Sequence, residues 1–240
     1  MRLIRVIIFG LIAACNFAKF ILIGSYFNMG VGMFCIAVAV VEVIIGKWKK
    51  EIKHKVLYFL GTVFAALIMV WISTWEFGFA NFGVYALKIR YADRIGYTTS
   101  HFPQEVPENA RLLNCTMMPT IMQGSGNVQA TFGAEGEVLE ALEQQAKEAC
   151  IMSFSAADYV NGNLPEEDQK LAQKIFEEKT DFENTEARIQ VCDPTGMIRE
   201  CASTHDMTIY ILDSNFYWNH IHTDSVLVDH TGHEIQYVGE

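Results

Sequence analysis

Apolar residues gather in three long runs within the first third of the chain. Residues 56–75 form a charge-free run of twenty, residues 29–46 contain one glutamate, and residues 6–23 contain one lysine and one asparagine. A helix rises about 1.5 Å per residue, so about twenty residues cross the hydrocarbon core of a bilayer. The pattern therefore predicts about three N-terminal transmembrane helices within a membrane anchor that spans residues 1–90.

Basic residues indicate on which side of the membrane each end of the chain lies. Residues 47–55 hold five lysines between the second and third runs, and Arg2 and Arg5 lie at the N-terminus. Short loops rich in Lys and Arg stay in the cytoplasm. Three crossings would leave the N-terminus in the cytoplasm and everything after residue 75 outside the cell membrane.

Residues 77–89 bear directly on this topology. They are apolar and aromatic, and basic residues lie within them or just after them. A fourth crossing here would return the C-terminal part of the chain to the cytosol. Thirteen residues are too few for a helical crossing. We therefore expect an interfacial extension of the third helix.

Four charged side chains lie inside or beside the apolar runs. Arg5 and Glu42 fall near the inner end of the helices, and Lys19 and Glu76 fall near the outer end. Opposite charges at one depth can pair between helices, but a long side chain can also reach the nearest interface by itself. Because none of the four lies at mid-depth, we expect each to reach its interface separately.

After residue 90 the pattern changes to short elements that are separated by polar turns. Residues 91–110, with two prolines, are typical of an extended connector. Period-two alternation and helical spacing predict strands at 111–118, 128–132, 187–192, 207–212, 225–229 and 234–238, and helices over 135–150 and from Pro165. This order predicts that residues 111–240 form a soluble α+β domain with a mostly antiparallel sheet and two helices.

The C-terminal part of the chain is strongly acidic. From Glu76 to Glu240 there are 26 acidic and 10 basic side chains, a net charge of −16. Nucleic-acid phosphates require Lys and Arg, so nucleic acid is not an expected partner. The expected partners are the lipid bilayer and another membrane or envelope protein.

Four cysteines fall in the predicted soluble domain: Cys115, Cys150, Cys192 and Cys201. An even number of cysteines outside the cytosol permits disulfides. Cys115 lies on the apolar face of its predicted strand and Cys150 on that of its predicted helix, so these two can meet in the core. Cys192 and Cys201 would then close a short loop. We expect at least one disulfide, with buried thiols as the alternative.

Histidines are concentrated at the C-terminal end, where five of seven fall in the last 36 residues. His220 and His222 share one face of a strand, and Asp224 continues that face. Imidazole and carboxylate groups suit zinc or copper, so His220 and His222 are a candidate metal site. Solvated or hydrogen-bonded histidines are the alternative, and the sequence indicates no other cofactor.

Phe216, Tyr217 and Trp218 form the densest aromatic cluster outside the apolar runs. Exposed, they would contact a ligand or a partner; buried, they would belong to the core. No nucleophile-elbow spacing and no paired-carboxylate signature is found, so we assign no catalytic residue and favour binding over catalysis.

These observations predict a membrane-anchored extracytoplasmic binding or interaction module, which would use the sheet face or the aromatic cluster. The alternative is an extracytoplasmic metal-binding protein with a histidine-rich C-terminal sheet. An envelope hydrolase ranks third, because the chain offers only scattered Ser, His and Asp residues.

Overall fold

The computed structural model describes residues 2–48, 55–73, 78–79, 82–118, 126–170, 206–217 and 220–239. Within these ranges the side chains of residues 46–48, 55, 160, 214–217 and 220–222 are not described. The chain divides into two compact units, Met1–Lys88 and Ile89–Glu240.

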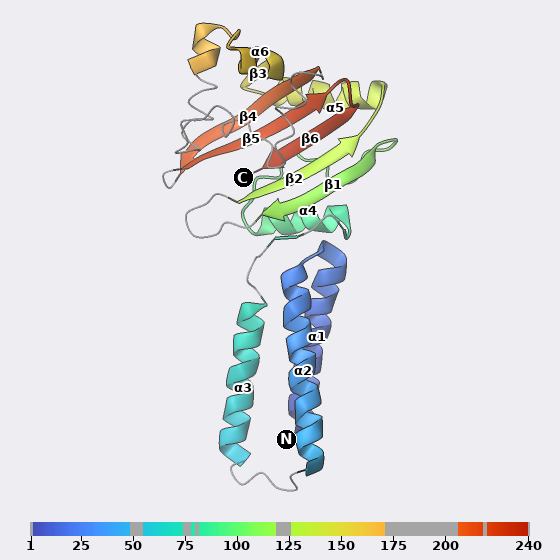
Figure 1. Ribbon diagram of the computed structural model, residues 1–240, viewed down its shortest axis with the longest axis vertical. Coiled ribbons are helices and arrows are strands. Elements are labelled where there is room, and N and C mark those ends of the chain that lie inside the picture. The colour runs from blue at the N-terminus through green and yellow to red at the C-terminus, as the bar shows by residue number, and fades with distance from the viewer. Residues whose placement is uncertain are drawn as a thin grey trace. The chain divides into compact units, whose positions relative to one another are not determined.

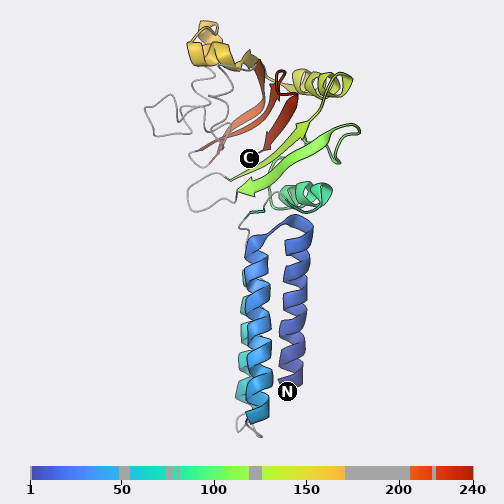
Figure 2. The ribbon, with the colours of Figure 1, turned by 45° about the vertical axis from the view of Figure 1, so that its right-hand side comes forward.

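The first unit contains three apolar helices, which are labelled in Figure 1. They are α1 (Arg2–Ile23), α2 (Tyr26–Trp48) and α3 (Lys55–Ile72). α1 and α2 lie side by side as a helical hairpin that reverses at Gly24 and Ser25 (Figures 1 and 2). By length and composition, α1 and α2 could each cross a membrane, whereas α3 is shorter.

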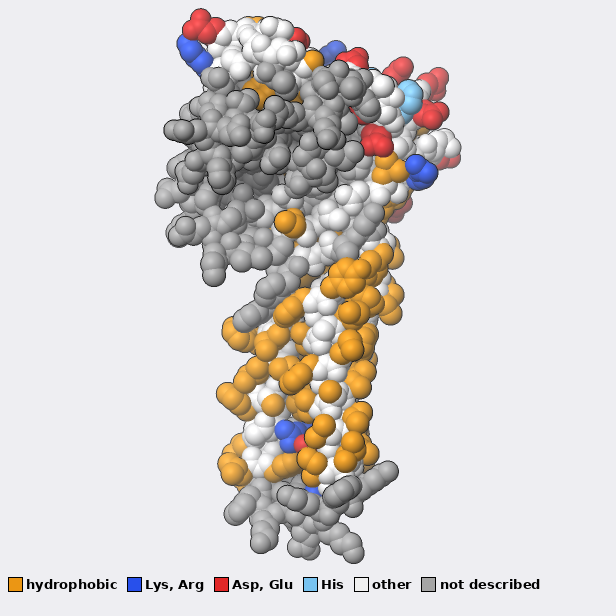
Figure 3. Space-filling view, viewed as in Figure 1, with side chains coloured by type: hydrophobic (Ala, Val, Ile, Leu, Met, Phe, Trp, Pro, Cys, Tyr) orange, Lys and Arg blue, Asp and Glu red, His pale blue; other side chains and the backbone are white. Residues whose placement is uncertain are grey.

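Apolar side chains cover both the inside and the outside of this helical unit. Phe9 and Ala13 of α1 and Val31 and Cys35 of α2 form a buried cluster. Three α3 side chains pack against this cluster: Ala65, Met69 and Ile72. Further large apolar side chains are exposed, among them Leu3, Leu11, Ile21, Val56, Leu57, Phe64 and Leu67, and apolar atoms line the helices in Figure 3. Helices that are apolar all round are typical of a membrane or of a buried core.

A separate helix, α4 (Tyr85–Arg94), replaces the expected extension of α3 over residues 77–89. Gly83 accounts for the non-helical backbone just before it. The glycine has φ +107°, and a Cβ there would lie 2.7 Å from the carbonyl oxygen of Leu22. The N–H of Val84 donates to that same oxygen at 2.8 Å. Only glycine permits so close an approach, so the chain turns before a new helix begins.

The second unit contains a six-stranded antiparallel sheet, which confirms the predicted sheet type. The strand order is β1-β2-β6-β5-β4-β3 (Figure 1). The strands are β1 (Arg111–Met118), β2 (Asn127–Gly133), β3 (Met152–Ser155), β4 (Met207–Tyr217), β5 (His220–Asp229) and β6 (Glu234–Gly239). Among its described residues, this unit also contains the end of α4, the helices α5 (Glu137–Ala149) and α6 (Ala156–Asn161), and helical residues 166–170.

Most predicted elements of this unit have counterparts in the structure. β1 has the predicted bounds, β2, β6 and α5 differ from theirs by one or two residues, and residues 166–170 are helical after Pro165. The strand expected at 187–192 lies outside the described residues. β3 and α6 were not expected, because elements of four and six residues are too short to show a period.

One face of the sheet is apolar over most of its width, from β1 to β5, and we call it the apolar face. Directly opposed residues of neighbouring strands lie on the same side of a sheet. Cys115, Ala130, Tyr237, Val226 and Tyr210 stand opposite one another in successive strands, and all are buried. Helix α5 packs on this face, where its Glu143 contacts Tyr210.

The segment expected to be an extended connector also packs on the sheet. The ring of Phe102 lies 5.6 Å from that of Tyr237, and His101 Nε2 is 3.0 Å from the carbonyl oxygen of Val238. Tyr97 and Phe102 are buried. His101 and Phe102 thus contact β6, whereas the hydroxyl of Tyr97 donates to the carbonyl oxygen of Met118 on β1.

The opposite face, which we call the divided face, is apolar on one side of the sheet and mostly polar on the other. Over β3, β4 and β5 it carries a buried apolar cluster that includes Phe154, Ile209 and Leu227, and Tyr159 of α6 belongs to the same cluster. Over β1, β2 and β6 its residues are mostly polar. This polar part is the strongest candidate for a binding surface.

Candidate functional site

Six neutral polar side chains share one part of the divided face, and we call them the polar half-face. They are Asn114 and Thr116 on β1, Gln129 and Thr131 on β2, Gln236 on β6 and Ser225 on β5. The register places Asn114 opposite Thr131 and Thr131 opposite Gln236, while Thr116 stands opposite Gln129. The alternation of apolar and polar residues along β1 and β2 directs these side chains to one side.

Gln129 carries a buried, unsatisfied hydrogen-bond donor within the polar half-face. Its side chain is 2% exposed, and its Oε1 accepts a hydrogen bond of 3.4 Å from Nε2 of Gln236. Its own Nε2 has no hydrogen-bond acceptor among the described residues. A buried donor left without an acceptor costs about 1–3 kcal/mol.

A second polar cluster ties α5 to the apolar face. Glu143 Oε1 accepts a hydrogen bond from the hydroxyl of Tyr210 at 2.6 Å and lies 3.2 Å from Nε2 of His230. Burial raises the pKa of Tyr210 well above its ordinary value, and the hydrogen bond to Glu143 raises it further. Sequence reasoning missed this cluster, because its members come from three separate elements and no short motif links them.

His220 and His222, the predicted metal ligands, occupy alternate positions at the start of β5, and Asp224 continues the series. Asn215 stands opposite His222 in the β4–β5 hairpin. The side chains of both histidines lie outside the described set. Among the described residues, no three His, Cys, Asp or Glu side chains are placed to hold a metal ion. The zinc or copper site at His220 and His222 stays a prediction.

The predicted aromatic contact residues fall at the same end of this hairpin. Phe216 pairs with Ile221, Tyr217 pairs with His220, and Trp218 lies outside the described residues. The hairpin therefore brings the backbone of Phe216 and Tyr217 close to that of His220. Contact with a ligand at these aromatic residues stays a prediction.

The predicted bond between Cys115 and Cys150 does not form, and this expectation was wrong. Cys115 lies on β1 at one edge of the sheet, whereas Cys150 ends α5 just before β3 at the other edge. Strands are spaced about 4.8 Å apart, so these edges are about 24 Å apart, while disulfide Cα atoms lie within about 7 Å. Cys192 and Cys201 lie outside the described residues.

Buried polar contacts join the three helices of the first unit. Arg5 Nη1 of α1 and Glu42 Oε1 of α2 form an ion pair of 2.7 Å. The hydroxyl of Tyr58 on α3 donates to the other oxygen of Glu42, and the Arg5 guanidinium lies 4.8 Å from the Tyr58 ring centre. Our expectation that Arg5 and Glu42 reach the interface separately was wrong, because each helix supplies a partner at the same level.

A second set of contacts joins α1 to the residue just after α3. Asn16 Nδ2 donates to Ser73 Oγ at 2.9 Å, and Lys19 Nζ donates to the Ser73 carbonyl oxygen at 3.0 Å. Glu76, the other charge considered at this end, lies outside the described residues. α3 is therefore attached to the helical hairpin near both of its ends.

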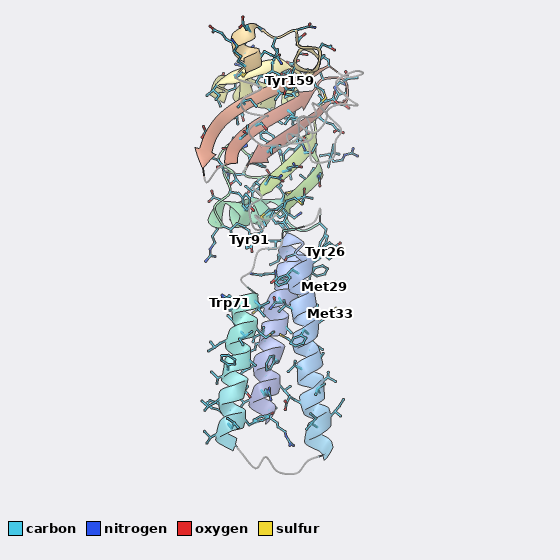
Figure 4. All side chains as sticks on the ribbon, turned by 60° about the vertical axis from the view of Figure 1, so that its left-hand side comes forward. Tyr26, Met29, Met33, Trp71, Tyr91 and Tyr159 are labelled. Atoms are coloured by element: carbon cyan, nitrogen blue, oxygen red, sulfur yellow. The ribbon has the colours of Figure 1, made fainter. Side chains whose placement is uncertain are left out.

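Aromatic side chains gather near the same end of the helical unit as Ser73. The rings of Phe20, Tyr26 and Phe82 lie 5.1–5.8 Å apart in pairs. Figure 4 shows Tyr26, Met29 and Met33 along α2, with Trp71 near the end of α3. Aromatic belts of this kind are typical of a membrane–water interface.

The chain matches no protein-family model, no curated protein sequence and no solved structure. The case for its function therefore rests on these residues and their contacts.

Proposed function

We propose that this protein is a membrane-anchored binding module, in which three helices hold a sheet domain outside the cell membrane and the polar half-face binds the ligand. The observation that carries the binding function is the buried Nε2 of Gln129, which has no acceptor among the described residues. Sites for small ligands combine such polar groups with a rigid scaffold, and a sheet supplies that scaffold.

The contacts of α3 support a third crossing beside α1 and α2. Eighteen residues give a helix of about 27 Å, slightly short of a hydrocarbon core of about 30 Å. Flanking residues and local thinning of the bilayer accommodate a mismatch of this size. Tyr58 bonds to Glu42 near one end and Ser73 bonds to Asn16 near the other, so α3 runs the length of the hairpin.

The placement of the sheet domain outside the membrane rests on charge and on the number of crossings. Arg2, Arg5 and the five lysines of residues 47–55 favour the cytoplasmic side for that end of the bundle. The aromatic rings of Phe20, Tyr26 and Phe82 favour an interface at the opposite end. An odd number of crossings then carries the second unit to the outside.

The composition of the polar half-face favours binding over catalysis. Its six side chains are amides and hydroxyls, and none of them is a general base at neutral pH. Amides and hydroxyls both donate and accept hydrogen bonds, so such a surface can orient a polar ligand without reacting with it.

Site-specific photocrosslinking in cells that produce the full chain tests this proposal. A diazirine amino acid replaces Thr131 on the half-face in one variant and Gln144 on the exposed side of α5 in a control. We expect a discrete adduct from position 131 and none from position 144. No adduct at position 131, or the same adduct at both positions, would count against binding at the polar half-face.

A further inference from the structure

We infer that helix α4 lies along the membrane surface, where Arg90 and Arg94 bind the phosphate groups of anionic phospholipids, an inference that rests on the membrane anchor proposed above. The side chains of Leu87, Arg90 and Arg94 are all exposed. A helix turns by about 100° per residue, so these three side chains project within about 60° of one another. We call these three residues the basic face of α4.

The side of α4 opposite the basic face is buried. Tyr85, Ile89 and Ala92 are each at most 5% exposed. At about 100° per residue these three side chains project away from the basic face, so the packing of the helix leaves that face uncovered. A helix that combines a leucine with arginines on its exposed side is typical of segments that lie in a membrane–water interface.

α4 begins where the apolar hairpin of α1 and α2 ends. The N–H of Val84, just before α4, donates to the carbonyl oxygen of Leu22 in the last turn of α1. Both side chains are exposed, Val84 by 49% and Leu22 by 42%. The rings of Phe20, Tyr26 and Phe82 gather at the same end of the hairpin, and such rings favour the level of the lipid headgroups. The start of α4 therefore lies where the proposed bilayer ends.

The charge of α4 is opposite to that of the chain after it. α4 holds three of the ten basic residues between Glu76 and Glu240, a region with a net charge of −16, and its one acidic residue, Asp93, projects outside the basic face. Neither Arg90 nor Arg94 forms an ion pair within the described part of the chain. Guanidinium groups bind phosphate through two parallel hydrogen bonds, so both arginines are suited to a phospholipid headgroup.

Two simpler explanations account for less of the basic face. A basic residue in the last turn complements the helix dipole, which explains Arg94 but not Arg90 in the middle of α4. An acidic protein could contact both arginines, but the net charge of −16 would repel it. The anchor instead holds the bilayer beside α4, so contact with lipid requires no second encounter. Charges are screened over about 8 Å, so a phosphate beside α4 interacts mainly with the charges of α4 itself.

Photocrosslinking of the full chain in lipid nanodiscs tests this inference. The discs contain equal amounts of neutral phosphatidylcholine and anionic phosphatidylglycerol. A diazirine amino acid replaces Leu87 on the basic face, Phe64 on the exposed side of α3 or Gln144 on the exposed side of α5. Position 87 should give lipid adducts that are enriched in phosphatidylglycerol. Position 64 should give lipid adducts without this enrichment, and position 144 should give none.

Substitutions beside the diazirine at position 87 measure what each arginine contributes. Arg90→Gln and Arg94→Gln should each lower the enrichment about fivefold, which is the effect of one cation near an anionic surface. Arg111→Gln and Lys147→Gln remove exposed cations outside α4 and should leave the enrichment unchanged. Salt at about 1 M shortens the range of exposed charges to about 3 Å and should also lower the enrichment.

The outcomes separate the contact of α4 with lipid from the anchor. Lipid adducts at position 64 but none at position 87 leave the anchor standing and rule out the surface contact. Adducts at position 87 without an excess of phosphatidylglycerol, or with an excess that both arginine variants keep, rule out recognition by Arg90 and Arg94. A protein adduct in place of a lipid adduct at position 87 in cells overturns the inference in favour of an acidic protein. Absence of lipid adducts at both positions rejects the proposed anchor as well.

Discussion

The hydroxyl of Tyr210 on β4 donates a 2.6 Å hydrogen bond to the carboxylate of Glu143 on α5. The same carboxylate oxygen lies 3.2 Å from His230, which follows β5. One side chain of the helix therefore contacts a residue of β4 and the residue that follows the neighbouring strand β5. This contact fixes the position of α5 on the apolar face more specifically than apolar packing alone.

Loss of this contact should weaken the sheet domain. Tyr210→Phe removes the donor and should lower the free energy of unfolding by about 2 kcal/mol, because the bond is made to a charged group. Chemical denaturation of the full chain in micelles measures the loss. The double variant with Glu143→Gln should lose less than the sum of the single losses. Additive losses would show that the two side chains act independently.

The ion pair between Arg5 and Glu42 should be the main polar contact within the helical bundle. Arg5→Glu or Glu42→Arg alone places two like charges side by side. Each change should lower the free energy of unfolding by about 3 kcal/mol, because breaking a buried ion pair leaves a charge without a partner. The double variant restores opposite charges and should recover part of that loss. Denaturant titration in mixed micelles measures all three variants, and a double variant no better than the worse single one would contradict the pairing.

His101 should make the sheet domain less stable in mild acid. Burial lowers its pKa from 6.5 to about 4, and its hydrogen bond to Val238 only partly opposes this shift. Between these values the unfolded chain binds a proton that the folded chain does not. The free energy of unfolding is therefore highest above pH 6.5. It decreases by about 3 kcal/mol as the pH falls from 6.5 to 4.

Thermal unfolding across this pH range tests the role of His101. His101→Gln keeps a donor for the Val238 carbonyl but does not titrate, so its melting temperature should depend less on pH than that of the natural chain. His233→Asn changes an exposed histidine at φ 55° to another residue that tolerates this backbone. This control should keep the natural pH dependence, and an unchanged dependence in His101→Gln would rule out the assignment.

Cys150 should react with thiol reagents from outside the cell, whereas Cys115 should not. Cys150 is partly exposed at the end of α5, and Cys115 is fully buried on β1. A membrane-impermeant maleimide applied to intact cells should label the natural chain more than Cys150→Ser. Cys115→Ala should change labelling only after denaturation. If Cys150 reacts only after the cells are lysed, the second unit lies in the cytosol.

Local pattern predicted the regular elements of this fold well. The alternation of Leu, Asn, Cys and Thr along residues 111–118 defines β1, and the stripe of Leu139, Leu142 and Ala146 defines the buried face of α5. Each of these elements buries one face, so its period is visible in the sequence. β4 extends beyond its predicted end because its register with β5 continues through polar residues.

Contacts between distant segments were not predictable in the same way. The bond between Cys115 and Cys150 was expected because both lie on apolar faces, but strand order places them at opposite edges. Strand order also brings Gln129 beside Gln236, and no local pattern indicates this neighbour. The polar half-face is therefore a property of topology, and the sequence alone predicted only that a sheet face or the aromatic cluster would bind a partner.

The position of β6 has a consequence for how the sheet domain forms in time. β6 lies between β2 and β5, and Phe132 of β2 pairs with Ile235, roughly a hundred residues later in the chain. During synthesis the β1–β2 hairpin is therefore complete before β6 exists. The edge of β2 that pairs with β6 stays uncovered until β6 has been made. Until then that edge is open to other chains. The domain would thus depend on prompt completion of the chain, or on a chaperone that shields the waiting hairpin.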